Sequence, residues 1–342
     1  MYGYRDIKTV HLEVTEKCQA GCAMCGRHSD VGDLNHHLTE TELTLEDCKK
    51  IFPVSFVKQL RRMYMCGNFG DPIFAKETLE IFEYFRDNNL AMDLAMYTNG
   101  GARNEEWWKN LAALDVKVIF AIDGLEDTNH IYRQNVNWKR VMTSAKTYIA
   151  AGGNAVWHYL VFKHNEHQIE DARSLSIEMG FADFQPKKSS RFTLQSQTFK
   201  HLSIPSKKEY INDKVLIRND IKEKYGSYDR YLDQTEISCM VKQQKNVYVS
   251  ATGHVFPCCW LGYEPFDDKI EDPKSAQIFD LIKDFDYIDA KKHGIDGVIE
   301  SGFFDGIEKS WSLDSTTAGK LKTCAKTCSK QHNFFKNQFD IT

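Results

Sequence analysis

The stretch Val14-Thr-Glu-Lys-Cys18-Gln-Ala-Gly-Cys22-Ala-Met-Cys25 decides the interpretation of this chain, because it places three cysteines close together directly after a short apolar segment. Three residues and then two separate the cysteines. Three thiolates can hold three irons of a 4Fe-4S cubane and leave one iron open, whereas a purely electron-transferring cluster normally has four protein ligands. The alternative is a zinc site, which needs a fourth ligand that His28 could supply.

Composition sets the broad class. The chain has 342 residues, of which 42% are hydrophobic, and a formal net charge of −4. It is long enough for one large domain and a smaller one. No targeting segment and no apolar run of the roughly twenty residues that cross a bilayer are evident, so a cytoplasmic protein with no membrane contact is expected. Ten cysteines in such a chain favour metal sites over disulfides. Without a basic excess, no nucleic-acid binding is expected.

From residue 9 to about 186, short β-rich runs alternate with amphipathic stretches, which is typical of parallel βα units. Strands are predicted at 9–14, 62–66, 91–97, 116–122, 155–162 and 182–185. Helix caps are predicted for Thr44 with Asp47 and for Asn165 with Gln168, and a helix end at Gly180. Six repeats predict an open α/β barrel, whose active site lies at the carboxyl ends of the strands.

The CxxxCxxC spacing resembles that of the radical S-adenosylmethionine (SAM) superfamily. In that family the open iron chelates the amino and carboxylate groups of SAM, and reduction of the cluster yields a 5'-deoxyadenosyl radical that removes a hydrogen atom from the substrate. The resemblance implies a partial (β/α)6 radical SAM barrel and a SAM-binding 4Fe-4S cluster on Cys18, Cys22 and Cys25. It also implies SAM itself and a flavodoxin- or ferredoxin-type reductant.

The segment Cys66-Gly-Asn-Phe-Gly-Asp-Pro72 follows the second predicted strand. It resembles the Gly-Gly-Glu-Pro segment that binds the SAM amino group in the family, with Asp71 in place of Glu, although alone it would be an ordinary turn. For Arg133 the alternative is a surface ion pair, and for Asn165 it is the helix cap. The resemblance implies these SAM-pocket residues: Met24, where the family often has an aromatic residue, and Gly67, Asn68, Gly70, Asp71, Thr98, Asn99, Asp123, Arg133 and Asn165.

A second group of cysteines lies near the carboxyl end. Thirteen residues separate Cys239 from Gly253, four separate that glycine from Cys258, and Cys324 and Cys328 follow later. Residues 247–256 predict a β-hairpin around the glycine turn. The spacing resembles the SPASM-related twitch domain, which implies a second, auxiliary 4Fe-4S cluster on these four cysteines. A structural zinc site with the same ligands is the alternative.

The resemblance thus implies three parts: a radical SAM core barrel over 1–190, a helical linker over 191–234 and a small α+β twitch-like domain over 235–342. It implies an oxidoreductase that abstracts hydrogen from a small polar molecule or a peptide residue, with the auxiliary cluster accepting an electron. The first strand begins within ten residues of the start, so we expect no built-in leader-binding domain. Arg191, just after the sixth strand, is the expected substrate anchor.

Cys259, next to Cys258, leaves the outcome of the reaction open. It is a packed thiol, an alternative cluster ligand, or the hydrogen-atom donor of a redox-neutral radical epimerase. A non-catalytic iron-sulfur or zinc protein on a barrel scaffold is a further alternative, and it predicts no SAM cleavage.

Overall fold

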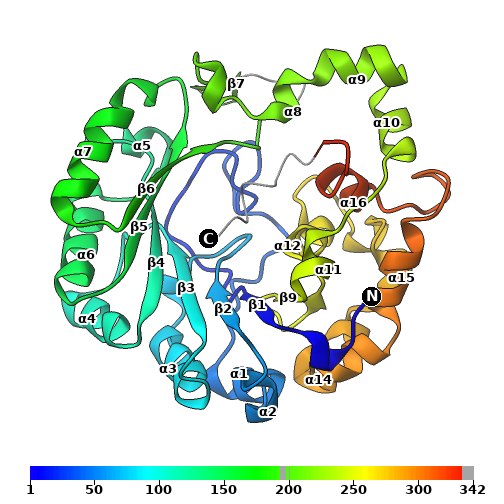
Figure 1. The fold of residues 1–342 in the computed structure, drawn as a ribbon, viewed down its shortest axis with the longest axis horizontal. Coiled ribbons are helices and arrows are strands. Elements are labelled where there is room, and N and C mark those ends of the chain that lie inside the picture. The colour runs from blue at the N-terminus through cyan, green and yellow to red at the C-terminus, as the bar shows by residue number, and fades with distance from the viewer. Residues whose placement is uncertain (193–197, 200, 333–342) are drawn as a thin grey trace.

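The computed structural model describes residues 1–192, 198–199 and 201–332. Its centre is an eight-stranded sheet with the order β10-β9-β1-β2-β3-β4-β5-β6, in which every neighbouring pair is parallel except β10 and β9 (Figure 1). The strands are β1 (Thr9–Leu12), β2 (Arg62–Met65), β3 (Asp93–Thr98), β4 (Val116–Ala121), β5 (Ala155–Val161), β6 (Asp183–Lys188), β9 (Asn246–Val249) and β10 (Val255–Phe256). The six predicted strands and the mostly parallel α/β fold are confirmed.

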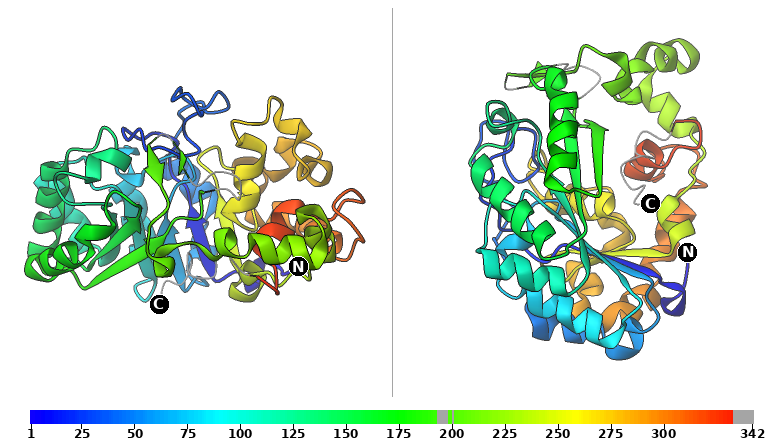
Figure 2. Two further views of the ribbon diagram at one scale, coloured as in Figure 1. Left: turned by 90° about the horizontal axis from the view of Figure 1, so that it is seen from above. Right: turned by 60° about the vertical axis from the view of Figure 1, so that its left-hand side comes forward.

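The helices that follow these strands lie outside the curved sheet, as two further views show (Figure 2). They are α1 (Leu45–Ile51), α2 (Val54–Val57), α3 (Thr78–Asn88), α4 (Glu105–Ala113), α5 (Asn129–Tyr132), α6 (Trp138–Ala150) and α7 (Ile169–Met179). The cap of α1 by Thr44 and Asp47 is confirmed, and so is the end of α7 at Gly180, which has a φ of 85°. The predicted cap at Asn165 is wrong, because its side chain accepts no capping bond.

A run of short elements leads from β6 to the carboxyl-terminal helices, along the top of the molecule in Figure 1. It comprises β7 (Thr198–Phe199), β8 (Leu202–Ser203), α8 (Asp213–Leu216), α9 (Arg218–Tyr225) and α10 (Tyr228–Gln234). The remaining helices are α11 (Met240–Gln244), α12 (Cys259–Tyr263), α13 (Phe279–Ile282), α14 (Ala290–Glu300), α15 (Phe303–Ser310) and α16 (Lys322–Thr327). None of the helices described is long and apolar enough to cross a membrane.

The predicted hairpin of residues 247–256 is confirmed as β9 and β10. It also extends the barrel sheet, since β9 pairs in parallel with β1 and places Tyr248 opposite His11. A segment from the last third of the chain therefore completes the sheet next to its first strand. The division of the chain into three domains stays a prediction.

The two faces of the sheet differ in their side chains. The face toward the helices carries aliphatic and aromatic residues that belong to the main core, such as Leu12 and Met63. The inner face carries a separate small cluster around Tyr64, where rings from neighbouring strands contact one another. His11 stacks on Tyr64 with centroids 4.5 Å apart, and Tyr248 meets His11 edge-on at 4.9 Å. The inner face thus carries rings with polar groups beside apolar residues such as Ile119 and Val156.

Candidate active site

A cavity of about 630 Å³ opens at the carboxyl ends of the first strands. One wall is the loop after β1, with Gly21 to Gly26, and another is the loop after β2, with Gly67 and Asn68. The carboxyl-terminal helices α12 and α16 close the far side through Trp260, Tyr263 and Thr327. This volume lies in the range of pockets that hold cofactors and small ligands. Residues from both ends of the chain therefore share one cavity.

Cys22 and Cys25 of the loop after β1 line this cavity, and Cys18 lies near both of them. Burial raises the pKa of the Cys18 thiol, and the neighbouring Cys22 and Cys25 add to the rise. Burial also raises the pKa of Cys22, which the guanidinium of Arg133 opposes. Arg133 Nη1 lies 3.7 Å from Cys22 Sγ, and the Ala20 amide donates to Cys18 Sγ at 3.4 Å. Hydrogen-bond donors and a cation thus face sulfur atoms, which suits thiolate ligands.

Among the residues described, no three His, Cys, Asp or Glu side chains converge closely enough to bind a single metal ion. The described side chains thus form no preformed zinc site with His28 or on the carboxyl-terminal cysteines. In a cubane each thiolate binds a different iron, so the ligand sulfurs stand farther apart than those around one ion.

Asp71 ties the loop after β2 to the loop after β3. Its Oδ2 accepts two hydrogen bonds from Asn99, one from the backbone N–H at 2.8 Å and one from Nδ2 of the side chain at 2.7 Å. Asn99 in turn accepts from Gln19 at 2.8 Å and lies 3.7 Å from Cys18 Sγ. Burial raises the pKa of Asp71, and these donors oppose the rise. Two predicted SAM residues, Asp71 and Asn99, therefore lie beside the cysteine loop.

Asp123 and Arg133 form a buried ion pair, with 2.6 Å between Oδ2 and Nε. Their side chains are only 1% and 16% exposed, so Arg133 does not form the surface pair considered as an alternative. The Leu160 amide donates to the other Asp123 oxygen at 2.6 Å. Arg133 thus bridges the end of β4 and the cysteine loop through Asp123 and Cys22.

The side chains of Asn165 and Thr98 form hydrogen bonds to backbone groups in the described structure. Asn165 is fully buried; its Nδ2 donates to the carbonyls of Asp123 and Leu160 at 2.8 and 2.9 Å, and its Oδ1 accepts the Phe162 amide at 2.7 Å. Thr98 Oγ1 accepts the Gly100 amide at 3.0 Å. Neither side chain lines the cavity, whereas Met24, with a φ of 61°, does.

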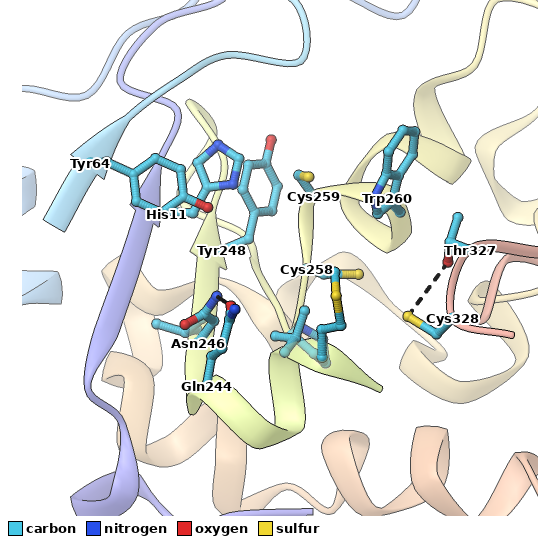
Figure 3. A pocket seen from close by; sticks show the side chains of 14 residues that line it. His11, Tyr64, Gln244, Asn246, Tyr248, Cys258, Cys259, Trp260, Thr327 and Cys328 are labelled. Carbon is cyan, nitrogen blue, oxygen red and sulfur yellow. Dashed lines mark hydrogen bonds between the residues drawn. The ribbon is translucent and has the colours of Figure 1, made fainter. Parts of the chain in front are cut away.

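Arg191 also lines the cavity, and it donates to the Tyr132 hydroxyl at 2.8 Å. Cys259 lies elsewhere. It lines a much smaller pocket of about 30 Å³ together with His11, Tyr64 and Tyr248 (Figure 3).

Glu13 is the functional candidate that sequence reasoning missed. It follows β1 and is 1% exposed, and burial raises its pKa to about 7. Its oxygens accept the amides of Phe69 and Gly70 and the hydroxyl of Tyr248. The loop fits tightly, because a Cβ on Gly70 would lie 1.8 Å from the Thr15 carbonyl oxygen. The available signal was a lone acid in the apolar run that contains β1.

The four carboxyl-terminal cysteines also gather in one place. Cys258 and Cys328 line the small pocket, beside Trp260 and Thr327 (Figure 3). A hydrogen bond between Cys239 and Cys328 raises the pKa of Cys239 and lowers that of Cys328 to about 7. Burial raises the pKa of Cys324, and Cys258 and Cys328 add to that rise. The fourth thiol is therefore near the other three.

The indole N–H of Trp311 lies beside one of these cysteines. Trp311 Nε1 has no hydrogen-bond partner within bonding distance among the residues described, yet its N–H lies near enough to Cys324 to lower the pKa of that thiol against the effect of burial. Thr327 Oγ1 donates to Cys328 Sγ at 3.9 Å. Donors that face sulfur, one of them without a partner, fit an anionic cluster whose sulfur atoms accept hydrogen bonds.

Residues 12–175 match the family model described as the radical SAM superfamily. This match covers just under half of the chain and identifies a radical SAM domain within it. The radical SAM family is one whose members use a 4Fe-4S cluster and SAM. The three-cysteine loop lies within the matched residues, whereas the cavity is lined both by matched residues and by residues from 190–191 and 260–327.

Individual relatives are distant. The chain is 26% identical over 129 residues to a tungsten-containing aldehyde ferredoxin oxidoreductase cofactor-modifying protein of Pyrococcus furiosus, a match that covers 36% of this chain and only 33% of that protein. The structure of anSMEcpe with bound AdoMet has a TM-score of 0.59 at 14% identity, covering 95% of this chain and 86% of that one. The structure of Streptococcus suis SuiB bound to the precursor peptide SuiA has a TM-score of 0.54 at 14% identity, and the match covers 81% of this chain and 65% of that one. Identities this low show the shared fold alone.

Proposed function

We propose that this radical SAM protein binds a 4Fe-4S cluster on Cys18, Cys22 and Cys25 and cleaves SAM reductively, so that a hydrogen atom is removed from a small polar molecule or a peptide residue. The observation that carries the proposal is the position of these thiols: Cys22 and Cys25 line a cavity of about 630 Å³, and Cys22 lies 3.7 Å from Arg133 of the buried Asp123–Arg133 pair. When bound, the reduced cluster and SAM supply the radical that abstracts hydrogen.

The residues of this chain have separate tasks in that proposal. Asp71 and Asn99 fix the loop that would hold the SAM amino group, and Gly67, Asn68 and Met24 form the adjacent cavity wall. Arg133 neutralises Asp123 beside Cys22, which keeps the buried carboxylate ionised. Asn165 and Thr98 act through the backbone that they hold. Asp71, Asn99, Arg133, Asn165 and Thr98 are therefore positioning residues, because their side chains form hydrogen bonds or ion pairs with other groups of the protein.

We further propose that Cys239, Cys258, Cys324 and Cys328 hold an auxiliary 4Fe-4S cluster, which would give net oxidation of the substrate. Support comes from the gathering of the four thiols and from the unpartnered Trp311 donor beside Cys324. Four protein ligands leave no open iron, so this cluster would accept an electron without binding substrate. Residues 235–342 would then be the cluster-binding domain, joined to the barrel of residues 1–190 by the segment 191–234.

The substrate would enter the same cavity, where the cation of Arg191 would anchor an anionic group of the substrate. Among proteins that share the fold, SuiB is described with a bound precursor peptide, and anSMEcpe with a bound Cp18Cys peptide. These neighbours support a peptide as one substrate class. A flavodoxin- or ferredoxin-type protein would supply the electron.

The test combines metal content with SAM cleavage after anaerobic reconstitution. Wild type should bind about eight irons and release 5'-deoxyadenosine under strong reductant, and the Cys18→Ala/Cys22→Ala/Cys25→Ala variant should keep about four irons and release none. Cys48→Ala is the matched control, since Cys48 is a fully buried thiol on α1 away from both sites. SAM cleavage that survives in the triple variant would refute the proposal. An iron content of about four in wild type and none in the triple variant would refute the auxiliary cluster.

A second candidate is a redox-neutral epimerase with Cys259 as hydrogen-atom donor. Its support is the environment of this thiol, which is buried near Cys66 and Glu13 beside the barrel interior. Cys259→Ala decides between the two: an epimerase would lose product and keep both clusters. A variant with the same product at the wild-type rate would rule out this donor.

A further inference from the structure

A buried carboxyl lies where the loop after β2 meets the carboxyl-terminal hairpin. Glu13 Oε1 accepts the Phe69 amide at 2.7 Å and the Gly70 amide at 3.2 Å. Its Oε2 accepts the hydroxyl of Tyr248 from β9. Three segments that are far apart in the sequence therefore share one side chain, and none of the roles proposed above uses it.

Glu13 sets the direction of two carbonyl groups. In a trans peptide unit the N–H and the C=O point in opposite directions. Because the amides of Phe69 and Gly70 point at Glu13, the carbonyls of the same peptide units, those of Asn68 and Phe69, point away from it. Gly67 and Asn68 line the large cavity. Carbonyl oxygens fixed at a cavity wall are acceptors that suit an ammonium group.

The carboxyl-terminal part holds the same loop from the other side. Asn68 Nδ2 donates to the Tyr248 hydroxyl at 3.2 Å and to the Cys259 carbonyl at 3.0 Å. The Tyr248 hydroxyl therefore contacts both Glu13 and Asn68. Loss of this hydroxyl would leave the buried Glu13 with one donor fewer and free the Asn68 side chain on one side.

We infer that Glu13, held by Tyr248, is a positioning residue that directs the backbone carbonyls of residues 68 and 69 toward the ammonium group of SAM, and that it makes SAM affinity depend on the docked hairpin and on pH. The inference rests on the proposed function, because it takes SAM as the ligand of this loop.

The pH dependence follows from the groups around Glu13. These are Tyr248 on β9, Cys66 at the end of β2, Cys259 on α12 and His11 on β1. Burial raises the pKa values of the tyrosine and of both thiols and lowers that of His11 to about 4, so all four are neutral near pH 7. Burial raises the pKa of Glu13 to about 7, so Glu13 itself changes charge there.

Ionisation of Glu13 strengthens its bonds to the loop amides and adds negative charge close to a cationic ligand. SAM affinity should therefore rise as the pH increases through 7. If SAM binding lowers the pKa of Glu13 by about half a unit to one unit, linkage gives a gain of about 3- to 10-fold.

The experiment measures SAM affinity by anaerobic calorimetry on fully reconstituted protein at pH 6 and pH 8. Glu13→Gln keeps the shape and removes the charge, so we expect binding about 3- to 10-fold weaker than wild type at pH 8 and nearly equal at pH 6. Titration of the SAM amino group itself cancels in this ratio. Tyr248→Phe should weaken binding at both pH values. Tyr148→Phe is the control, because it removes an equally buried hydroxyl bond, to the Val116 carbonyl on the helix side of the sheet.

Wild-type affinity in both variants at both pH values would overturn the inference and leave the proposed function standing. If wild type with an iron-loaded three-cysteine site fails to bind SAM, the proposed function fails and the inference with it. If the variants lose iron, hydrogen exchange in loaded wild type decides the matter. Slow exchange of the amides of Phe69 and Gly70 without SAM supports the inference, and rapid exchange overturns it.

Discussion

Arg133→Met should strongly destabilise the protein, because it leaves the Asp123 carboxylate buried without its cation. The pair is separated by 2.6 Å, and Asp123 is 1% exposed. Breaking a buried pair by removing one partner costs about 3–5 kcal/mol, which corresponds to a fall on the order of 10 °C in the unfolding midpoint for a chain of this size. Methionine keeps most of the apolar part of the arginine side chain, so the loss of stability measures the effect of removing the positive charge.

The loss should depend on pH in a defined direction. Burial raises the pKa of Asp123, and Arg133 is the largest influence that opposes the rise. Without Arg133 the carboxyl pKa in the folded protein rises further above that in the unfolded chain. Stability is then retained at low pH, where Asp123 is protonated in both states, and is lost as the pH rises through the folded pKa. The variant should fall further below wild type at neutral pH than at about pH 4, close to the pKa of an aspartate in an unfolded chain.

Thermal unfolding of loaded protein under anaerobic conditions measures both effects. Asp123→Asn/Arg133→Met should recover at least half of the loss, because asparagine still accepts the Leu160 amide. Arg133 also lies near Cys22, so the same substitution in the three-cysteine-to-alanine background separates the two contacts. A cost below about 1 kcal/mol, or a double variant no more stable than the single one, would refute the reasoning.

Three further outcomes are expected. Burial raises the pKa of Glu13 to about 7, so between pH 6 and pH 8 wild type should lose about 1 kcal/mol more stability than Glu13→Gln, measured by thermal unfolding; parallel profiles would contradict this. Trp311→Phe should lower the auxiliary reduction potential by about 20–60 mV in an EPR titration, since the indole N–H beside the Cys324 sulfur is lost as a donor to the cluster. Trp138→Phe, which removes another buried and unpartnered indole N–H in the described structure, should leave the potential unchanged. Gly70→Ala should abolish SAM binding in calorimetry, because its Cβ would lie 1.8 Å from the Thr15 carbonyl oxygen, whereas Gly306→Ala, with 3.5 Å of clearance, should bind normally.

Local patterns predicted the elements of this fold well and their long-range partners poorly. The six strands follow from apolar runs of the right length between helical stretches, which is information carried by neighbouring residues. The hairpin at residues 247–256 was predicted for the same reason. Its pairing with β1 was not, because a β-strand pattern does not specify which free edge the strand will join.

The site shows the same limit at individual residues. Asn165 has the local spacing of a helix cap, but its amide instead bonds the Asp123 carbonyl, 42 residues away in the sequence. Glu13 and Tyr248 are 235 residues apart, so no spacing rule connects them. The first cysteine motif was recognisable because its three cysteines come from one short loop, whereas the residues that position that loop come from distant parts of the sequence.

The pairing of β9 with β1 changes how the two halves of this chain depend on each other. On one side, β1 hydrogen-bonds to β2, whose following loop carries Gly67 to Gly70. On the other side it hydrogen-bonds to β9, which precedes Cys258 by only a short hairpin. The chain leaving β1 then passes through Glu13 and reaches Cys18 within a few residues. Without residues 246–249, β1 would be an open edge and Glu13 would lose Tyr248. The two cysteine sites are therefore held by adjacent strands of one sheet, so that displacement of either strand alters the geometry of both.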